Sequence, residues 1–270
     1  VDAAGQRAGD HREQRTAVTA STVAGTGFTV VALAMLLAGP DGPFRLTMTA
    51  LTVVGLVSTI VPAIDRTTLR LGSVAACLIL VNLVVATCYF ATESLIPLVF
   101  DTVRSDGTVI AGLVISAGSL LWSAGTWAQA RVARRANRNI LVPIGVAVTV
   151  FGLFACSRAL MGGSATGLVA VAWWTATAGM GLITSYIAFV VMSDAAMDSE
   201  RASTLLQASN LGASYLGASF FAGAVARRLP DDGASAAIAP NQLLMLSAVF
   251  VSFVVVLRMR GLKSHQASTR

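Results

Sequence analysis

A run of 24 residues without charge, 107–130, is the sequence feature that most restricts what this chain can fold into. An α-helix rises about 1.5 Å per residue, so a helix of this length crosses the roughly 30 Å hydrocarbon core of a bilayer. The run therefore predicts a transmembrane helix.

Small side chains recur along this predicted helix at spacings of four, three and four residues. They are Gly112, Ser116, Ser119 and Ser123. Such spacing places them on one side of the helix, and small residues allow the backbones of two membrane helices to approach closely. The pattern predicts that a second helix packs against this side.

Four arginines follow the run within eight residues: Arg131, Arg134, Arg135 and Arg138. Positive charge next to a membrane span favours retention of the loop on the cytoplasmic side. The cluster therefore predicts the direction in which the span crosses the membrane.

The composition supports a membrane protein. Hydrophobic residues make up 55% of the chain, charged residues make up 12% and the mean hydropathy is +0.74, whereas charged residues make up about a quarter of a typical soluble domain. The net charge of +6 comes from basic residues between apolar runs, so it indicates topology determinants and no nucleic-acid partner. Cys77, Cys88 and Cys156 lie inside apolar runs without C-x-x-C spacing, which favours packing over a disulfide or metal role.

Eight apolar runs can be recognised, and they predict an all-α membrane protein with about eight transmembrane helices. A linker, 1–15, precedes them, and a tail, 258–270, follows. The runs are 16–38, 46–64, 71–100, 107–130, 140–156, 167–192, 202–226 and 241–257.

Placing the N-terminus inside puts 14 of the 19 basic residues in the cytoplasm. The five left outside are Arg45, Arg104, Arg158, Arg227 and Arg228. This count predicts a cell-membrane protein with both termini in the cytoplasm. It also places Trp173 and Trp174 near the outer interface, where amphipathic rings are favoured.

A resemblance to a known family begins at the arginine cluster. The pattern G-x-W-x-Q-x-R-x-x-R-R resembles the second copy of the major facilitator superfamily loop motif, which follows the eighth helix of that superfamily. Its residues here are Gly125, Trp127, Gln129, Arg131, Arg134 and Arg135. Residues 91–118 and 198–224 are similar to the seventh-to-eighth and eleventh helix regions of its drug:proton antiporters, and the resemblance extends from about residue 71 to the C-terminus.

The resemblance implies that 71–257 is the six-helix C-terminal half of a transporter and that 16–70 holds two additional helices. It further implies proton-coupled efflux of small molecules or drugs by alternating access. The expected partners are the lipid bilayer, a small-molecule substrate, protons, and either a missing N-terminal half or a second copy of the chain. A truncated or split reading frame and an alternative start codon are both compatible with the initial valine.

The alternative is a non-transporting membrane remnant, or a scaffold subunit that pairs with a separate N-terminal half. The presence of six further spans in the DNA upstream, in frame or in an adjacent gene, would distinguish these interpretations. No enzyme, cofactor or metal is expected, because His11 and His265 lie in the tails and no phosphate-binding loop is present.

Glu93 is the carboxylate within the predicted spans, four residues before Pro97. A carboxyl group in hydrocarbon stays neutral until water or a cation reaches it, as a proton-coupling group does. Alternatively, Glu93 lies at the outer interface and anchors the helix. Asn82 and Tyr89 share this span and are candidates for the substrate or proton pathway, and Asn82 could instead make an interhelical hydrogen bond.

The seventh run carries a polar stripe whose members again recur at spacings of four, three and four. It consists of Ser203, Gln207, Asn210 and Ser214. The stripe either lines the transport pathway or joins closely packed helices by hydrogen bonds. In the sixth run, the resemblance assigns Thr175, Thr177, Thr184 and Tyr186 to a central pathway, whereas threonines in helices commonly bond to their own backbone.

Overall fold

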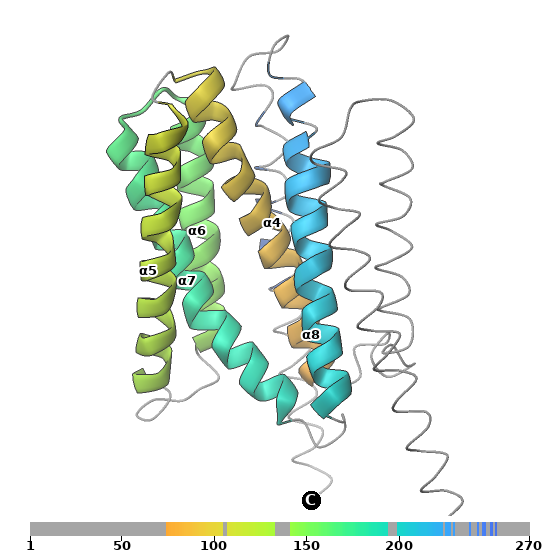
Figure 1. The fold of residues 1–270 in the computed structure, drawn as a ribbon. Coiled ribbons are helices and arrows are strands. Elements are labelled where there is room, and N and C mark those ends of the chain that lie inside the picture. Colours follow the sequence, from red (N-terminus) through yellow and green to blue (C-terminus); the bar gives the residue numbers. More distant parts are fainter. Residues whose placement is uncertain are drawn as a thin grey trace, which may run out of the picture.

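The computed structural model describes residues 74–104, 107–132, 141–193 and 199–223, with isolated residues and short segments between 225 and 252. Helices make up this part of the chain, and it contains no strand (Figure 1). They are α4 (Val74–Thr102), α5 (Thr108–Val132), α6 (Leu141–Met161), α7 (Thr166–Met192) and α8 (Ser199–Ser214), which continues as the π-helix η3 (Tyr215–Phe221).

Four of these helices, α4, α5, α6 and α7, are long and apolar enough to cross a membrane. Their ends lie within five residues of the ends of the predicted runs. The all-α membrane architecture is therefore confirmed for the described part. The runs 16–38 and 46–64 lie outside the described residues, as does most of 241–257, so a total of eight spans stays a prediction.

Successive helices run in opposite directions. Gly145 and Gly152 of α6 lie against Ile183 and Ala176 of α7 respectively, which is an antiparallel register. Arg104, at the end of α4, donates hydrogen bonds to the Ser164 carbonyl and the Thr166 hydroxyl between α6 and α7. The α4–α5 and α6–α7 connections therefore share one end of the bundle, as helices that cross a membrane in turn require.

Helix α7 packs between α5 and α6, and glycines bring the backbones together. A Cβ atom at Gly179 of α7 would lie 2.6 Å from the Thr149 backbone nitrogen of α6. On the other side of α7, Gly125 of α5 lies against the Ala178 carbonyl, and Gly181 lies against the Trp122 carbonyl. Close backbone contact of this kind replaces the hydrophobic driving force that apolar helices lack in lipid.

The face of α5 that makes this contact is not the predicted one. Gly112, Ser116, Ser119 and Ser123 are all exposed, and no described neighbour lies within 4 Å of a Cβ atom built at Gly112. The buried positions of α5 are Ala111, Val114, Gly118 and Gly125. These residues also recur at helical spacing, so short side chains line two sides of α5. Among the described helices, only the second side makes close contacts.

Helix α8 and its continuation η3 lie alongside α4 (Figure 1). The Ala222 amide donates to the Gly217 carbonyl, five residues earlier, which is the hydrogen bond that defines a π-helix. A Cβ atom at Gly217 would lie 2.5 Å from the Thr87 carbonyl oxygen and 2.6 Å from the Ala91 nitrogen. The π-helix is therefore in direct backbone contact with α4.

Candidate functional site

A polar cavity of about 330 Å³ lies between α4, α7 and α8. Its polar lining residues are Asn82, Thr184, Ser185, Ser203, Gln207 and Asn210, and its apolar ones are Ala188, Met192 and Leu206. The cavity stands out because α4 and α7 otherwise bury apolar side chains for most of their length. Polar groups inside an apolar bundle are costly, so a cluster of them indicates a site.

Asn82 forms the α4 wall of the polar cavity. Its side chain is 3% exposed. The side-chain amide nitrogen Nδ2 of Asn82 donates to the Ser209 hydroxyl at 2.8 Å and to the side-chain oxygen Oδ1 of Asn210 at 3.0 Å. The interhelical hydrogen bond considered from the sequence is thus present. Asn82 also lines the cavity, so the two interpretations of this residue are compatible.

The polar stripe of α8 forms a second wall. Ser203, Gln207 and Asn210 line the cavity, while Ser214 does not. The Gln207 amide nitrogen donates to the Ser203 hydroxyl at 3.2 Å, and both Gln207 and Asn210 are exposed. These three residues are four and three positions apart, and a helix with 3.6 residues per turn places such side chains on the same side.

Helix α7 contributes Thr184 and Ser185 to the polar cavity. Thr184 donates to the Met180 carbonyl, and Thr175 and Thr177 likewise bond within α7, which confirms the backbone bonding considered for these threonines. Ser185 donates to the Thr126 hydroxyl of α5 at 3.4 Å. Sequence reasoning missed Ser185, although it directly follows Thr184.

Tyr89 lies elsewhere, in an aromatic cluster between α4, α5 and α7. Its ring stacks on Trp173 at 4.8 Å and meets Trp122 edge-on at 5.5 Å. Tyr89 is 6% exposed and Trp173 is fully buried. Trp173 therefore packs inside the bundle, and its depth relative to the outer interface stays a prediction.

Glu93 is one turn beyond Tyr89, is partly buried and does not line the polar cavity. A rise of about 1.5 Å per residue puts it roughly 14 Å from the Thr102 end of α4. Pro97 lies inside the same helix and has no N–H to donate to the Glu93 carbonyl. A carboxyl group and a backbone carbonyl without its usual helical donor therefore both belong to Glu93, and the coupling and anchoring interpretations both stay predictions.

The residues of the loop motif fall at the end of α5. Gly125 makes the close contact with Ala178 described above, and the Arg131 guanidinium lies 4.0 Å from the centre of the Trp127 ring. Gln129 is partly buried. Arg134 and Arg135 lie outside the described residues.

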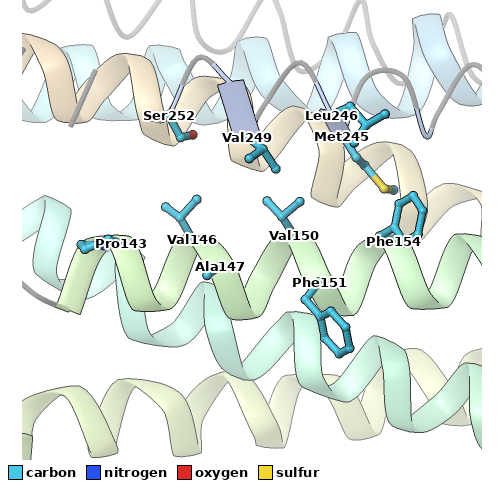
Figure 2. A pocket seen from close by; sticks show the side chains of 10 residues that line it. All are labelled: Pro143, Val146, Ala147, Val150, Phe151, Phe154, Met245, Leu246, Val249 and Ser252. Atoms are coloured by element: carbon cyan, nitrogen blue, oxygen red, sulfur yellow. The ribbon is translucent and has the colours of Figure 1, made fainter. Parts of the chain in front are cut away.

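A larger groove, of about 510 Å³, lies between α6 and a second wall formed by Met245, Leu246, Val249 and Ser252. Figure 2 shows Val146 and Val150 pointing across it towards the segment that carries Met245 and Val249. Ser252 is the polar residue of an otherwise apolar lining. Such a surface offers little to distinguish a solute from lipid hydrocarbon, so the polar cavity is the better candidate site.

Cys77, Cys88 and Cys156 are buried, in agreement with the predicted packing role. Within the described residues, no group of three or more His, Cys, Asp or Glu side chains could hold a metal ion.

No protein-family model matches the chain, and no curated protein sequence matches it.

Proposed function

We propose that this chain is the C-terminal part of a major facilitator superfamily secondary transporter that exports small molecules or drugs in exchange for protons. The observation that carries the proposal is the polar cavity between α4, α7 and α8. Its lining residues come from three helices, and two of these helices are candidate membrane spans. A polar site formed between spans is what a solute pathway through a membrane requires.

In this proposal, 16–70 forms two additional spans and 71–257 forms the six-helix C-terminal half, giving eight spans in the chain. Gln207 and Asn210 contribute to the substrate pathway, and Glu93 carries the coupling proton. The missing half, from a separate N-terminal chain or a second copy of this one, faces the polar cavity and completes it. Alternating access arises when the two halves rock against each other around the site between them.

The alternative is a scaffold subunit without transport activity. The hydrogen bonds from Asn82 to Ser209 and Asn210 favour it to some extent, since they hold α4 to α8 as a structural polar contact would. They do not account for the exposed amide of Gln207, which bonds only along its own helix among the described residues. Transport therefore explains more of the polar cavity than packing does.

Filling the polar cavity tests the proposed function. In vesicles that contain the assembled transporter, Asn210→Phe should lower the initial rate of substrate efflux at least tenfold, because the ring occupies space that the solute must enter. The matched control is Leu120→Phe, which adds a ring at a position that is 72% exposed on α5. Equal efflux by the two variants would contradict the proposal.

The chain alone is expected not to catalyse coupled efflux, because one half has no partner to move against. Purified chain in vesicles should show no transport driven by a proton gradient unless a dimer is present. Cross-linking or mass photometry on the same preparation determines the oligomeric state. Coupled transport by a demonstrated monomer would contradict this expectation.

The charge distribution predicts the topology in a cell membrane, with both termini in the cytoplasm. Reporter fusions after Arg138 and after Lys263 should report the cytoplasm, and a fusion at Asp232 should report the exterior. An exterior signal at Arg138 would reverse the orientation of the whole bundle.

A further inference from the structure

Among the described residues, the side chains that line the polar cavity include no ionisable group. Six of the nine lining residues are polar, and all six are amides or hydroxyls. Glu200 and Arg201 lie in the first turn of α8, before the stripe begins, and neither is among the lining residues. The chemistry of the cavity is therefore that of hydrogen bonds between neutral groups.

Several of these polar groups are already used by the protein. The Asn82 amide nitrogen is held by Ser209 and Asn210, the Thr184 hydroxyl by the Met180 carbonyl, and the Ser185 hydroxyl by Thr126. These bonds fix the walls of the cavity. They also remove most donors from competition for a solute.

Two neighbouring side-chain amides on α8 each keep one polar atom for a ligand. The Asn210 carbonyl oxygen accepts from Asn82, which leaves the Asn210 amide nitrogen as a donor. The Gln207 amide nitrogen donates to Ser203, which leaves the Gln207 carbonyl oxygen as an acceptor. Residues three apart are neighbours on a helix surface, so the donor and the acceptor are adjacent and both side chains are exposed.

An adjacent donor and acceptor complement an amide or hydroxyl group, which can bond to both. An ion would bind less favourably, because a charge in an apolar bundle is costly to desolvate and the described lining residues supply no opposite charge. Ala188, Met192 and Leu206 supply the apolar contact that the carbon skeleton of such a solute needs.

We infer that the polar cavity binds an uncharged, hydrogen-bonding solute such as a small amide or alcohol, with Gln207 and Asn210 as its specificity-determining residues. The inference rests on the proposed function, since it treats the cavity as a solute site. It excludes permanent organic cations as the preferred ligands of this cavity.

Equilibrium binding to the assembled transporter in nanodiscs tests the inference separately from transport. The probes are chloramphenicol, which is uncharged and carries amide and hydroxyl groups, and tetraphenylphosphonium, a cation without hydrogen-bonding groups. Chloramphenicol should bind the wild type more tightly than tetraphenylphosphonium. Asn210→Leu and Gln207→Met should each weaken chloramphenicol binding about tenfold, because each leaves one of its hydrogen bonds unmade.

Gln207→Glu tests the charge argument, since it keeps the shape of the side chain and its acceptor oxygen but adds a negative charge. It should strengthen tetraphenylphosphonium binding about tenfold and change chloramphenicol binding less. Ser123→Ala, on the exposed side of α5 and not among the lining residues, should change neither affinity by more than about twofold.

Tighter binding of tetraphenylphosphonium than of chloramphenicol by the wild type would overturn the inference, as would unchanged chloramphenicol binding in Asn210→Leu and Gln207→Met. Absence of binding by either probe would also overturn it. Binding with the expected preference but without efflux in vesicles would support the inference about the ligand and contradict the proposed transport function.

Discussion

Replacing Gly152 by leucine should prevent α6 and α7 from packing and leave little folded protein. A Cβ atom at position 152 would lie 2.8 Å from the Ala176 Cα and 2.9 Å from the Ala172 carbonyl oxygen, both of which belong to the backbone of α7. A side chain cannot be accommodated there by a change of rotamer, so the helices must separate. We expect a loss of about 3 kcal/mol or more in the free energy of unfolding.

The measurement is unfolding in mixed micelles, followed by the fluorescence of Trp173 and the other tryptophans. The matched control is Gly112→Leu, which makes the same change on a different helix. No described atom lies within 4 Å of a Cβ atom at position 112, so this variant should change the stability by no more than about 0.5 kcal/mol. If Gly112→Leu were as destabilising as Gly152→Leu, a helix outside the described part would have to cover that side of α5.

Replacing Glu93 by glutamine should abolish the response of transport to the proton gradient in the assembled transporter. A gradient of one pH unit supplies about 1.4 kcal/mol for each proton, enough for a roughly tenfold concentration ratio of a solute exchanged with it. If Glu93 carries the proton, Glu93→Gln should reduce this ratio to about one while preserving insertion, because the amide keeps the shape of the carboxyl group. Efflux against an imposed pH gradient measures the ratio directly.

Glu93→Asp is the control, because it keeps the carboxyl group and should retain part of the gradient dependence. An interfacial anchor would behave differently, since exposed polar groups near lipid headgroups can be exchanged at little cost. Gradient dependence that survives in Glu93→Gln would exclude the coupling role. It would leave the polar cavity, which Glu93 does not line, as the basis of the proposed function.

The lengths of the helices could be predicted because apolar length alone determines whether a segment can span a bilayer. The 107–130 run became Thr108–Val132, and the 167–192 run became Thr166–Met192. The polar stripe of α8 was also recognisable, since spacings of three and four residues put side chains on one side of any helix. Both predictions depend on local geometry.

Predictions that depended on tertiary packing were less successful. Small residues line two sides of α5, and spacing alone cannot show that Gly118 and Gly125 face α7 while Gly112 faces no helix in the described part of the chain. The stacking of Trp173 on Tyr89 could not be foreseen either, because the two rings come from different helices. Ser185 was missed because its partner, Thr126, is distant in the sequence.

The π-helix has a consequence for how the chain tolerates insertions and deletions. A π-turn contains one residue more than the α-turn it replaces, so an α-helix that gains a residue can accommodate it as a local bulge. Removing Ala218 from η3 should restore α-helical hydrogen bonding. The residues after position 218 should then still face the same neighbours as before. The same deletion in α8, for example at Ala208, would rotate everything beyond it by about 100° and turn Asn210 away from Asn82. Length variation in natural relatives of this chain should therefore concentrate between Tyr215 and Phe221 and spare the stripe before it.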